Sequence, residues 1–322
     1  MQLPDPFICG FVPSLEVLPV LSGAREHGRR LQFKGCPGYG RIIRHLLTGD
    51  LQAGILPWEL FVSEILTRPG QDGRWAIPLV IQACPMELVL SRAAHRLCFS
   101  SRGPVSSREM RRLTFAIEAK RSLSRLQIAL WLSAIPGAAR PLFKVLPMEL
   151  MLKGLEAGMM DGIVAPAPWG LLAEAAGCGR LEVPFETGAY AQQVVLVCQQ
   201  NVCDAAPQIC QELPEACAAA RRQLTDPAAF LETASWATAA GWPQLTTELL
   251  RQSAARYPGP SGSGVPDFAP DQAWLTRELQ TLIEWQVLAP KESPATLAEG
   301  LLPRFPGNHR QEAGGQPAES PA

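Results

Sequence analysis

The sequence predicts an α/β protein built from two lobes, and three observations support this fold class. At 322 residues the chain is long enough for two domains of ordinary size. Short apolar runs alternate with stretches of helical spacing, as in strands joined by helical crossovers, which favours a largely parallel sheet. One combination of elements also occurs in each half of the chain: a helix, a Gly and an Asp, a strand, and then Pro-Trp. The part after about residue 207 is predicted to be helical.

In the first half, the apolar run from Phe7 to Val12 predicts a buried strand, followed by a helical stretch through Leu21. Helical spacing over residues 41–47 ends at Thr48-Gly49-Asp50 and gives way to a strand over residues 51–56. Further strands are predicted from Ala76 to Ala83 and from Glu87 to Leu90.

In the second half, strands are predicted from Leu113 to Ile117, Phe143 to Leu146, Gly162 to Ala165 and Val194 to Cys198. Three helices follow near residues 208–223, 227–255 and 271–287. The Gly-, Pro- and Ser-rich segment 257–270 is typical of a surface loop. Residues 304–322 have almost nothing apolar to bury, so we expect a disordered tail.

The repeated combination reads RIIRHLLTGDLQAGILPWEL in residues 41–60 and MELMLKGLEAGMMDGIVAPAPWG in residues 148–170. Two unrelated strands could end in Pro-Trp by chance. We prefer a duplicated topology, because the order of helix, turn, strand and Pro-Trp is the same in both segments.

Composition excludes several functional classes. Hydrophobic residues make up 47% and charged residues 18% of the chain, which is ordinary for a soluble folded protein. The formal charge of −1 provides no basic field for nucleic acid. No apolar window is long enough for a membrane span. We therefore expect no nucleic-acid partner, no membrane span and a monomer.

The cysteines and histidines do not occur at the sequence spacing typical of metal-binding motifs. The cysteine count is odd and contains no C-x-x-C pair, which predicts buried free thiols in a reducing compartment. The histidines are isolated, so we expect no metal site, no cofactor and no catalysis. The nine cysteines are Cys9, Cys36, Cys84, Cys98, Cys178, Cys198, Cys203, Cys210 and Cys217, and the four histidines are His27, His45, His95 and His309.

The first residues lack the basic region and the uninterrupted apolar stretch of a secretory signal. A cytoplasmic location is predicted for the sequence as it stands. A periplasmic or membrane-associated location is predicted instead if further residues precede this start.

Several motifs occur in the order found in nitrate- and bicarbonate-binding proteins of ABC transporters. In the second half these are Ser122-Leu123-Ser124, Leu130-Trp131-Leu132, Gly158-Met159-Met160-Asp161-Gly162 and Ala167-Pro168-Trp169. In the first half, GFVPSLEVLP and GYGRIIRHLLTGDLQAGILP resemble the opening strand and first helix of that family. The chain resembles this family of substrate-binding proteins from about residue 7 to about residue 200.

The resemblance implies a periplasmic-binding-protein fold of type 2, with two Rossmann-like lobes and a ligand cleft between them. The chain would cross from the first lobe into the second and back. We expect lobe 1 to comprise residues 1–93 and 190–303, and lobe 2 to comprise residues 94–189.

The resemblance also implies that small anions bind between the lobes, where helix N-termini attract negative charge. The corresponding candidate ligand-binding residues in this sequence are Ser14, Tyr39, Gln82, Cys84, Ser122, Ser124, Trp169 and Tyr190. Ser122 and Ser124 could equally cap the helix that follows them. Tyr39 could bond an oxyanion or pack at the mouth of its helix.

Four polar contacts of the family are changed in this chain, and one aromatic residue is exchanged for another. Tyr39 stands where the family has Trp, Cys84 replaces an amide, Ser124 replaces His and Ala167 replaces Glu before Pro-Trp. The basic residue expected near the return crossing has no counterpart in residues 186–193. Since charge-assisted hydrogen bonds are worth about 1.5 to 3 kcal/mol each, we expect nitrate affinity to be lost. Lys120 and Arg121 could supply replacement charge, and Glu118 could bind a cationic or hydroxylated group.

Three functions remain open at this point. The first is a solute-binding protein of ABC-transporter type with an altered ligand, working with a permease. The second is a cytosolic sensor of the same fold that regulates a partner protein such as an antiterminator. The third is an enzyme related to the thiamin-pyrimidine synthases, and against it stands the absence of their Cys-rich motif and active-site His.

Overall fold

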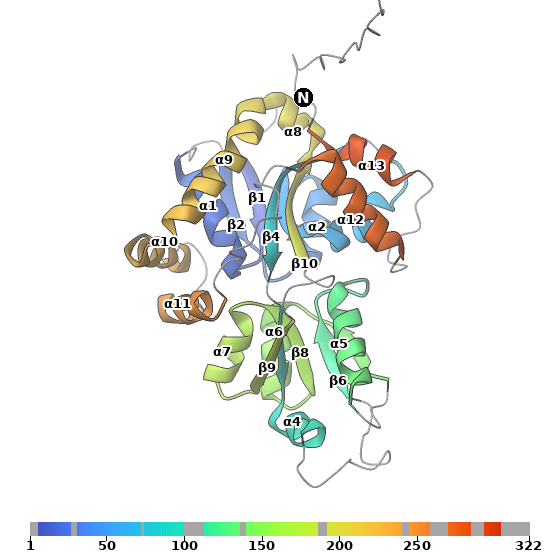
Figure 1. The fold of residues 1–322 in the computed structure, drawn as a ribbon, viewed down its shortest axis with the longest axis vertical. Helices are drawn as coiled ribbons and strands as arrows, with labels where there is room; N and C mark the ends of the chain where they lie inside the picture. The colour runs from blue at the N-terminus through green and yellow to red at the C-terminus, as the bar shows by residue number, and fades with distance from the viewer. Residues whose placement is uncertain are drawn as a thin grey trace, which may run out of the picture.

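The computed structural model describes residues 6–26, 31–71, 74–84, 86–99, 113–135, 140–185, 192–239, 245–257, 270–284 and 293–303. The described strands form two five-stranded sheets, each with helices packed against it (Figure 1). One sheet lies in each lobe, so the predicted α/β fold with two lobes is confirmed. None of the described helices is long and apolar enough to cross a membrane.

The first sheet has the strand order β2-β1-β3-β10-β4. Its strands β3 and β4 are apolar on both faces, because helices cover both sides. Ile55 and Leu79 belong to the core on the side of α1 and α9, whereas Leu56 and Val80 belong to the core on the side of α2 and α12. The elements of this part are β1 (Phe7–Phe11), α1 (Leu18–Glu26), β2 (Leu31–Gly35), α2 (Tyr39–Thr48), β3 (Ala53–Pro57), α3 (Trp58–Phe61), a π-helical turn (Val62–Leu66) and β4 (Trp75–Cys84).

The second sheet has the strand order β7-β6-β8-β5-β9. Its elements are β5 (Met86–Leu90), α4 (Arg92–Cys98), β6 (Thr114–Ile117), α5 (Leu123–Ser133), β7 (Leu142–Val145), α6 (Met148–Glu156), β8 (Gly162–Pro166), α7 (Trp169–Ala175) and β9 (Arg180–Phe185). The chain then returns to the first sheet through β10 (Gln192–Gln199).

The two sheets have the same topology. In each, the first strand lies between the second and third and is parallel to both, as shown by β1 with β2 and β3 and by β6 with β7 and β8. The strand beside the third one in each sheet directly follows a crossing of the chain between the lobes, and it is antiparallel to the third strand. This strand is β10 beside β3 in the first sheet and β5 beside β8 in the second. Trp58 and Trp169 each begin the helix after the third strand. The predicted duplication is therefore confirmed.

The prediction of a largely parallel sheet is wrong, because the crossing strands pair antiparallel with both of their neighbours. The first change of sheet lies between β4, which ends at Cys84, and β5, which begins at Met86, instead of at residue 93. The strand Met86–Leu90 is buried throughout and lies between β8 and β9. It therefore belongs to the second sheet, because only there do both of its edges find partners.

Two strands that the sequence analysis missed, β2 and β9, are edge strands in their sheets. The edge strand β4 is covered by helices and keeps an apolar run, whereas β2 is covered less and has none. In β2 only Leu31 is buried among five residues. The pattern that predicts buried strands is therefore absent.

The C-terminal part is helical, as predicted. It comprises α8 (Gln200–Ala205), α9 (Pro207–Gln223), α10 (Pro227–Ala239), α11 (Thr247–Arg256), α12 (Gln272–Glu284) and α13 (Pro294–Leu301). The single helix predicted over residues 227–255 is wrong, because α10 and α11 are separate helices. The side chain of Thr246 accepts a hydrogen bond from Leu249 N and so caps a new helix there.

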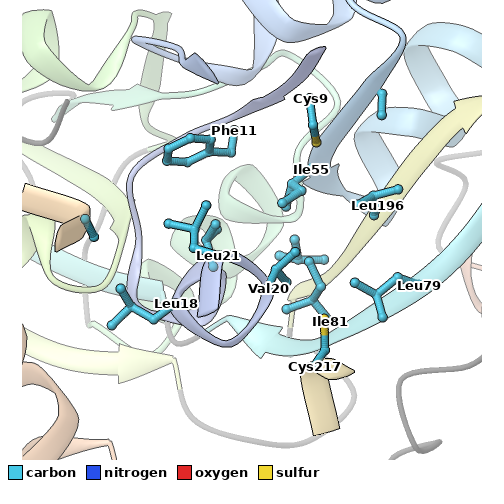
Figure 2. Close-up of a cluster of buried hydrophobic side chains, with 14 of the residues drawn as sticks. Cys9, Phe11, Leu18, Val20, Leu21, Ile55, Leu79, Ile81, Leu196 and Cys217 are labelled. Carbon is cyan, nitrogen blue, oxygen red and sulfur yellow. The ribbon is translucent and has the colours of Figure 1, made fainter. Parts of the chain in front are cut away.

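Helices α1 and α9 pack closely on one face of the first sheet, where Val20, Leu21 and Cys217 meet in the core (Figure 2). Gly23 lies at the point of closest approach. A Cβ atom at this position would lie 2.8 Å from the carbonyl carbon and oxygen of Ala216. Both are backbone atoms, so no side-chain rotation relieves the overlap.

We therefore expect Gly23→Ala to lower the free energy of unfolding by about 1 to 3 kcal/mol through overpacking. Gly40→Ala in α2 is a matched control, because a Cβ there meets nothing within 4 Å. The control should be neutral or slightly stabilising, as is usual for Gly to Ala in a helix. Urea denaturation of both variants measures the difference, and equal stabilities would contradict the close packing of α1 on α9.

Candidate ligand site between the lobes

The predicted Ser-x-Ser loop lies at the N-terminus of α5, on the side of the second lobe near the first (Figure 1). Ser122 occupies the N-cap position, but its side chain makes no capping hydrogen bond. Its hydroxyl is buried and has no hydrogen-bond partner among the described residues. Ser124 is fully buried, and its hydroxyl donates to Glu118 Oε1 at 2.8 Å. Neither hydroxyl caps the helix, which leaves the ligand-binding prediction for both residues open.

The first lobe contributes a carboxylate to the same helix N-terminus. Glu59 in α3 is 1% exposed, and its Oε1 accepts a hydrogen bond from Leu123 N at 3.4 Å. Nearby, Arg121 donates from its guanidinium to the carbonyl oxygen of Ser63 in the first lobe at 3.1 Å. A helix N-terminus attracts negative charge through its free N–H groups and its dipole. Here this attraction acts on a carboxylate of the chain itself.

A second contact between the lobes involves the Pro-Trp motif of the second lobe. Trp169 is 2% exposed, and its indole Nε1 donates to the carbonyl oxygen of Pro13 at 2.6 Å. Beside it, Leu15 N donates to the carbonyl oxygen of Ala167 at 2.9 Å. Ala167, where the family has Glu, thus contributes its backbone to the contact between lobes. The Trp169 N–H is already used within the protein.

Tyr39 is buried at the start of α2, where this helix meets the start of α6 in the other lobe. Met148 N at the start of α6 donates to the carbonyl oxygen of Pro37 at 3.1 Å. A Cβ atom at Gly38 would lie 3.4 Å from the Cα atom of Pro147. The N-termini of two helices, one from each lobe, therefore approach each other at Tyr39.

Glu87 in β5 makes a fourth contact between the lobes. It is fully buried, and its carboxylate accepts hydrogen bonds from Gly170 N at 2.7 Å and from the Tyr257 hydroxyl at 3.0 Å. Tyr257 follows α11, whereas Gly170 lies in α7 of the second lobe. Burial raises the pKa of Glu87 to about 7, although both hydrogen bonds favour the charged form.

The remaining predicted site residues are placed as follows. Ser14 is fully buried and its hydroxyl donates to the carbonyl oxygen of Val12 at 3.0 Å. Gln82 and Cys84 lie in β4, where Cys84 pairs with Gln192 of β10, beside the crossing between the sheets. Tyr190 lies outside the described residues. The structure thus brings Ser122 and Ser124 together, while Trp169 and Ser14 lie at the neighbouring contact around Pro13.

The sequence analysis missed Glu59 as a site residue. A signal was available, because Glu59 directly follows the first Pro-Trp, whose counterpart Trp169 was singled out. Sequence spacing alone does not predict that this carboxylate reaches a helix 64 residues away along the chain.

Two hollows lie elsewhere on the described surface. One, of about 740 Å³, lies between α12 and the start of α13 and is lined by Thr276, Arg277 and Ser293 among others. The other, of about 440 Å³, is on the second lobe and is lined by Arg92, Arg96 and Arg180 among others. Neither is lined by the predicted ligand-binding residues.

Comparison with known protein families identifies the group to which this fold and site belong. Residues 20–238 match the family model described as the NMT1-like family. The chain belongs to the NMT1-like family. The match covers α1 through α10 and therefore includes both sheets except β1. No curated protein sequence matches this chain.

Solved structures show the same fold at low sequence identity. The periplasmic nitrate-binding protein NrtA from Synechocystis PCC 6803 has a TM-score of 0.71 and 13% identity, over 92% of this chain and 86% of that chain. The ligand-binding component of an ABC-type import system from Staphylococcus aureus, with zinc bound, has a TM-score of 0.68 and 13% identity, over 93% and 96%. The alkanesulfonate-binding protein SsuA from Xanthomonas axonopodis pv. citri, bound to MOPS, has a TM-score of 0.65 and 13% identity, over 92% and 99%.

These structures confirm the predicted periplasmic-binding-protein fold and the predicted resemblance to nitrate-binding proteins at the level of the fold. They include binders of different ligands, so the fold does not select one. The side chains of this chain determine its ligand.

Proposed function

We propose that this protein is a solute-binding protein of ABC-import type, which binds a small polar ligand between its lobes and delivers it to a membrane permease. The proposal rests on the N-terminus of α5, where Ser124 donates to Glu118 within the second lobe and Leu123 N donates to Glu59 of the first. A ligand held there would contact both lobes, and closure of two lobes on a ligand is a common mode of recognition. The binding proteins of known structure that share this fold support the same role.

The ligand class follows from the carboxyl groups at this helix. Glu59 and Glu118 are both buried and both accept hydrogen bonds from groups at the first turn of α5. A free anion added beside a carboxylate at about 4 Å would experience a repulsion of roughly 4 kcal/mol at an effective dielectric constant of 20. A ligand with an ammonium group or several hydrogen-bond donors would instead be attracted. We therefore propose a cationic or donor-rich solute, and not nitrate, bicarbonate or a sulfonate.

The sensor and enzyme alternatives gain nothing from these comparisons, which are with binding proteins. The proposal accordingly includes no catalytic step. The cytoplasmic location and the monomeric state stay predictions.

Thermal-shift measurements on the purified full chain test the ligand class. The panel has one arm of anions (nitrate, nitrite, bicarbonate and alkanesulfonates) and one arm of cations and donors (ethanolamine, choline and aminopyrimidines). At 100 times its dissociation constant a ligand stabilises the protein by about 2.7 kcal/mol, which raises the melting temperature measurably. We expect a shift from a member of the second arm and none from the first.

The variant Glu59→Gln keeps the size of the side chain and removes its charge. We expect it to weaken binding of the cationic ligand at least tenfold and to permit weak binding of anions. Glu64→Gln, in the π-helical turn that follows α3, is the matched control and should bind as the wild type does. Binding of nitrate or sulfonate by the wild type would overturn the ligand class. Absence of any shift in both arms would contradict the binding function itself.

A further inference from the structure

Three cysteines that are separate in sequence come together at the end of the first lobe. Cys198 lies near the end of β10, Cys203 in α8 and Cys210 in the second turn of α9. The Sγ atoms of Cys198 and Cys203 are 3.3 Å apart, and those of Cys203 and Cys210 are 3.2 Å apart. All three Sγ atoms lie within 4.8 Å of one another. The sequence analysis expected no metal site here, because no C-x-x-C pair is present.

The local fold explains this arrangement. Strand β10 runs away from the second lobe and ends at Gln199, where α8 begins and turns the chain (Figure 1). Pro207 then starts α9 in a new direction, which suits a residue without an N–H group at the first helical position. The two reversals bring the end of a strand, a short helix and the first turns of a long helix to one point.

The three thiols are sealed from solvent. Cys198 is 1% exposed, Cys203 is 0% exposed and Cys210 is 7% exposed. Buried apolar residues of the same segments, such as Val202 and Leu213, belong to the surrounding core. Three buried thiol groups whose sulfur atoms converge form a ready set of soft ligands.

We propose that Cys198, Cys203 and Cys210 form a binding site for one thiophilic monovalent cation, Cu(I), in three-coordinate thiolate geometry. Thiolate ligands select Cu(I) and other soft ions over hard ones. A structural Zn(II) site takes four ligands, whereas among the described residues no histidine, carboxylate or further cysteine joins these three. Binding replaces thiol protons by the cation, and the protons pass to the solvent.

This site is independent of the proposed ligand site. It lies at the end of the first lobe that is remote from α5 and α7 (Figure 1). Its loss is therefore expected to leave solute binding unchanged, and failure of either proposal says nothing against the other.

Anaerobic titration of the reduced full chain with Cu(I), in competition with a chromogenic Cu(I) chelator such as bicinchoninate, tests the proposal. We expect one Cu(I) per chain. The variants Cys203→Ala and Cys210→Ser should each lower the affinity by more than about 100-fold, because even a residue outside the ligand shell can be worth 10- to 100-fold. Two variants are used so that the result does not depend on the folding of one.

Cys217→Ala is the matched control. Cys217 lies on the same helix as Cys210 and is fully buried, and burial raises the pKa of its thiol to about 12. It is outside the group of three, so its variant should bind Cu(I) as tightly as the wild type. Equal Cu(I) affinity of the wild type and Cys203→Ala would overturn the site.

Two further outcomes also decide against the proposal. Stoichiometric Zn(II) binding that exceeds Cu(I) binding in the matching chelator competition would refute the Cu(I) assignment. A disulfide between two of these cysteines, detected by mass spectrometry of alkylated peptides, together with no Cu(I) uptake after reduction, would assign the cluster to thiol oxidation instead.

Discussion

Replacing Trp169 with Ala is expected to lower the free energy of unfolding by about 3 to 5 kcal/mol, the usual range for a buried aromatic residue. Trp169 is 2% exposed and belongs to the core that includes Ala165 and Leu171 of the second lobe. Its indole also donates the 2.6 Å hydrogen bond to Pro13 in the first lobe. The variant therefore loses both packing in the second lobe and a contact between the lobes.

The variant Trp169→Phe separates these two contributions. It keeps most of the packing but removes the N–H donor, and we expect a loss of about 1 to 3 kcal/mol because the buried carbonyl of Pro13 loses this partner. Trp58→Phe is the matched control from the first repeat. Trp58 is equally buried, but its indole nitrogen has no hydrogen-bond partner among the described residues. Urea denaturation of the pair measures the difference, and equal losses would show that the bond to Pro13 contributes nothing.

The stability of the wild-type protein is expected to fall by about 3 kcal/mol between pH 4.5 and pH 7 on account of Glu87 alone. Burial raises the pKa of this carboxyl from 4.5 to about 7. Between these values the unfolded chain has released the proton while the folded protein still holds it. The folded state therefore binds more protons, and stability is lost as pH rises through this window and levels off above it.

Glu87→Gln should remove this dependence, because a Gln side chain carries no proton to release. The free energy of unfolding of the variant minus that of the wild type is expected to be larger at pH 8 than at pH 5. Denaturation midpoints and slopes at these two pH values provide the measurement. Glu156→Gln, at an exposed position at the end of α6, is the control and should keep the wild-type pH profile. A pH dependence of the same size in Glu87→Gln would refute this role.

Much of the fold could be predicted from the sequence, because its central strands are buried on both faces and read as apolar runs. Strands β3 and β8 show this, since all residues of each are buried. The edge strands β2 and β9 were missed, and in β2 the reason is that four of its five residues are not buried, which removes that pattern. The assignment of Met86–Leu90 to the first lobe was wrong, because an apolar run shows that a strand forms but not which sheet it joins.

Only the part of the candidate site that lies in one continuous segment of the chain could be predicted from the sequence. The loop of Ser122 and Ser124 follows a strand and begins a helix, and this order is visible in the sequence. Glu59, which meets that loop from the first lobe, follows the first Pro-Trp, but this local pattern does not show that its side chain reaches α5. The same holds for Tyr257, whose hydroxyl bonds Glu87 from 170 residues away.

The sequence by itself determined the α/β class, the two lobes and the duplicated helix, strand and Pro-Trp unit, because these depend on short-range periodicity and on residues that are neighbours in the chain. Only the tertiary structure decided which distant groups meet. It brought Glu59 to α5, Trp169 to Pro13, and three cysteines without metal-site spacing to within 4.8 Å of one another. Such contacts follow from how the chain reverses and crosses between the sheets, and no local pattern of residues encodes them.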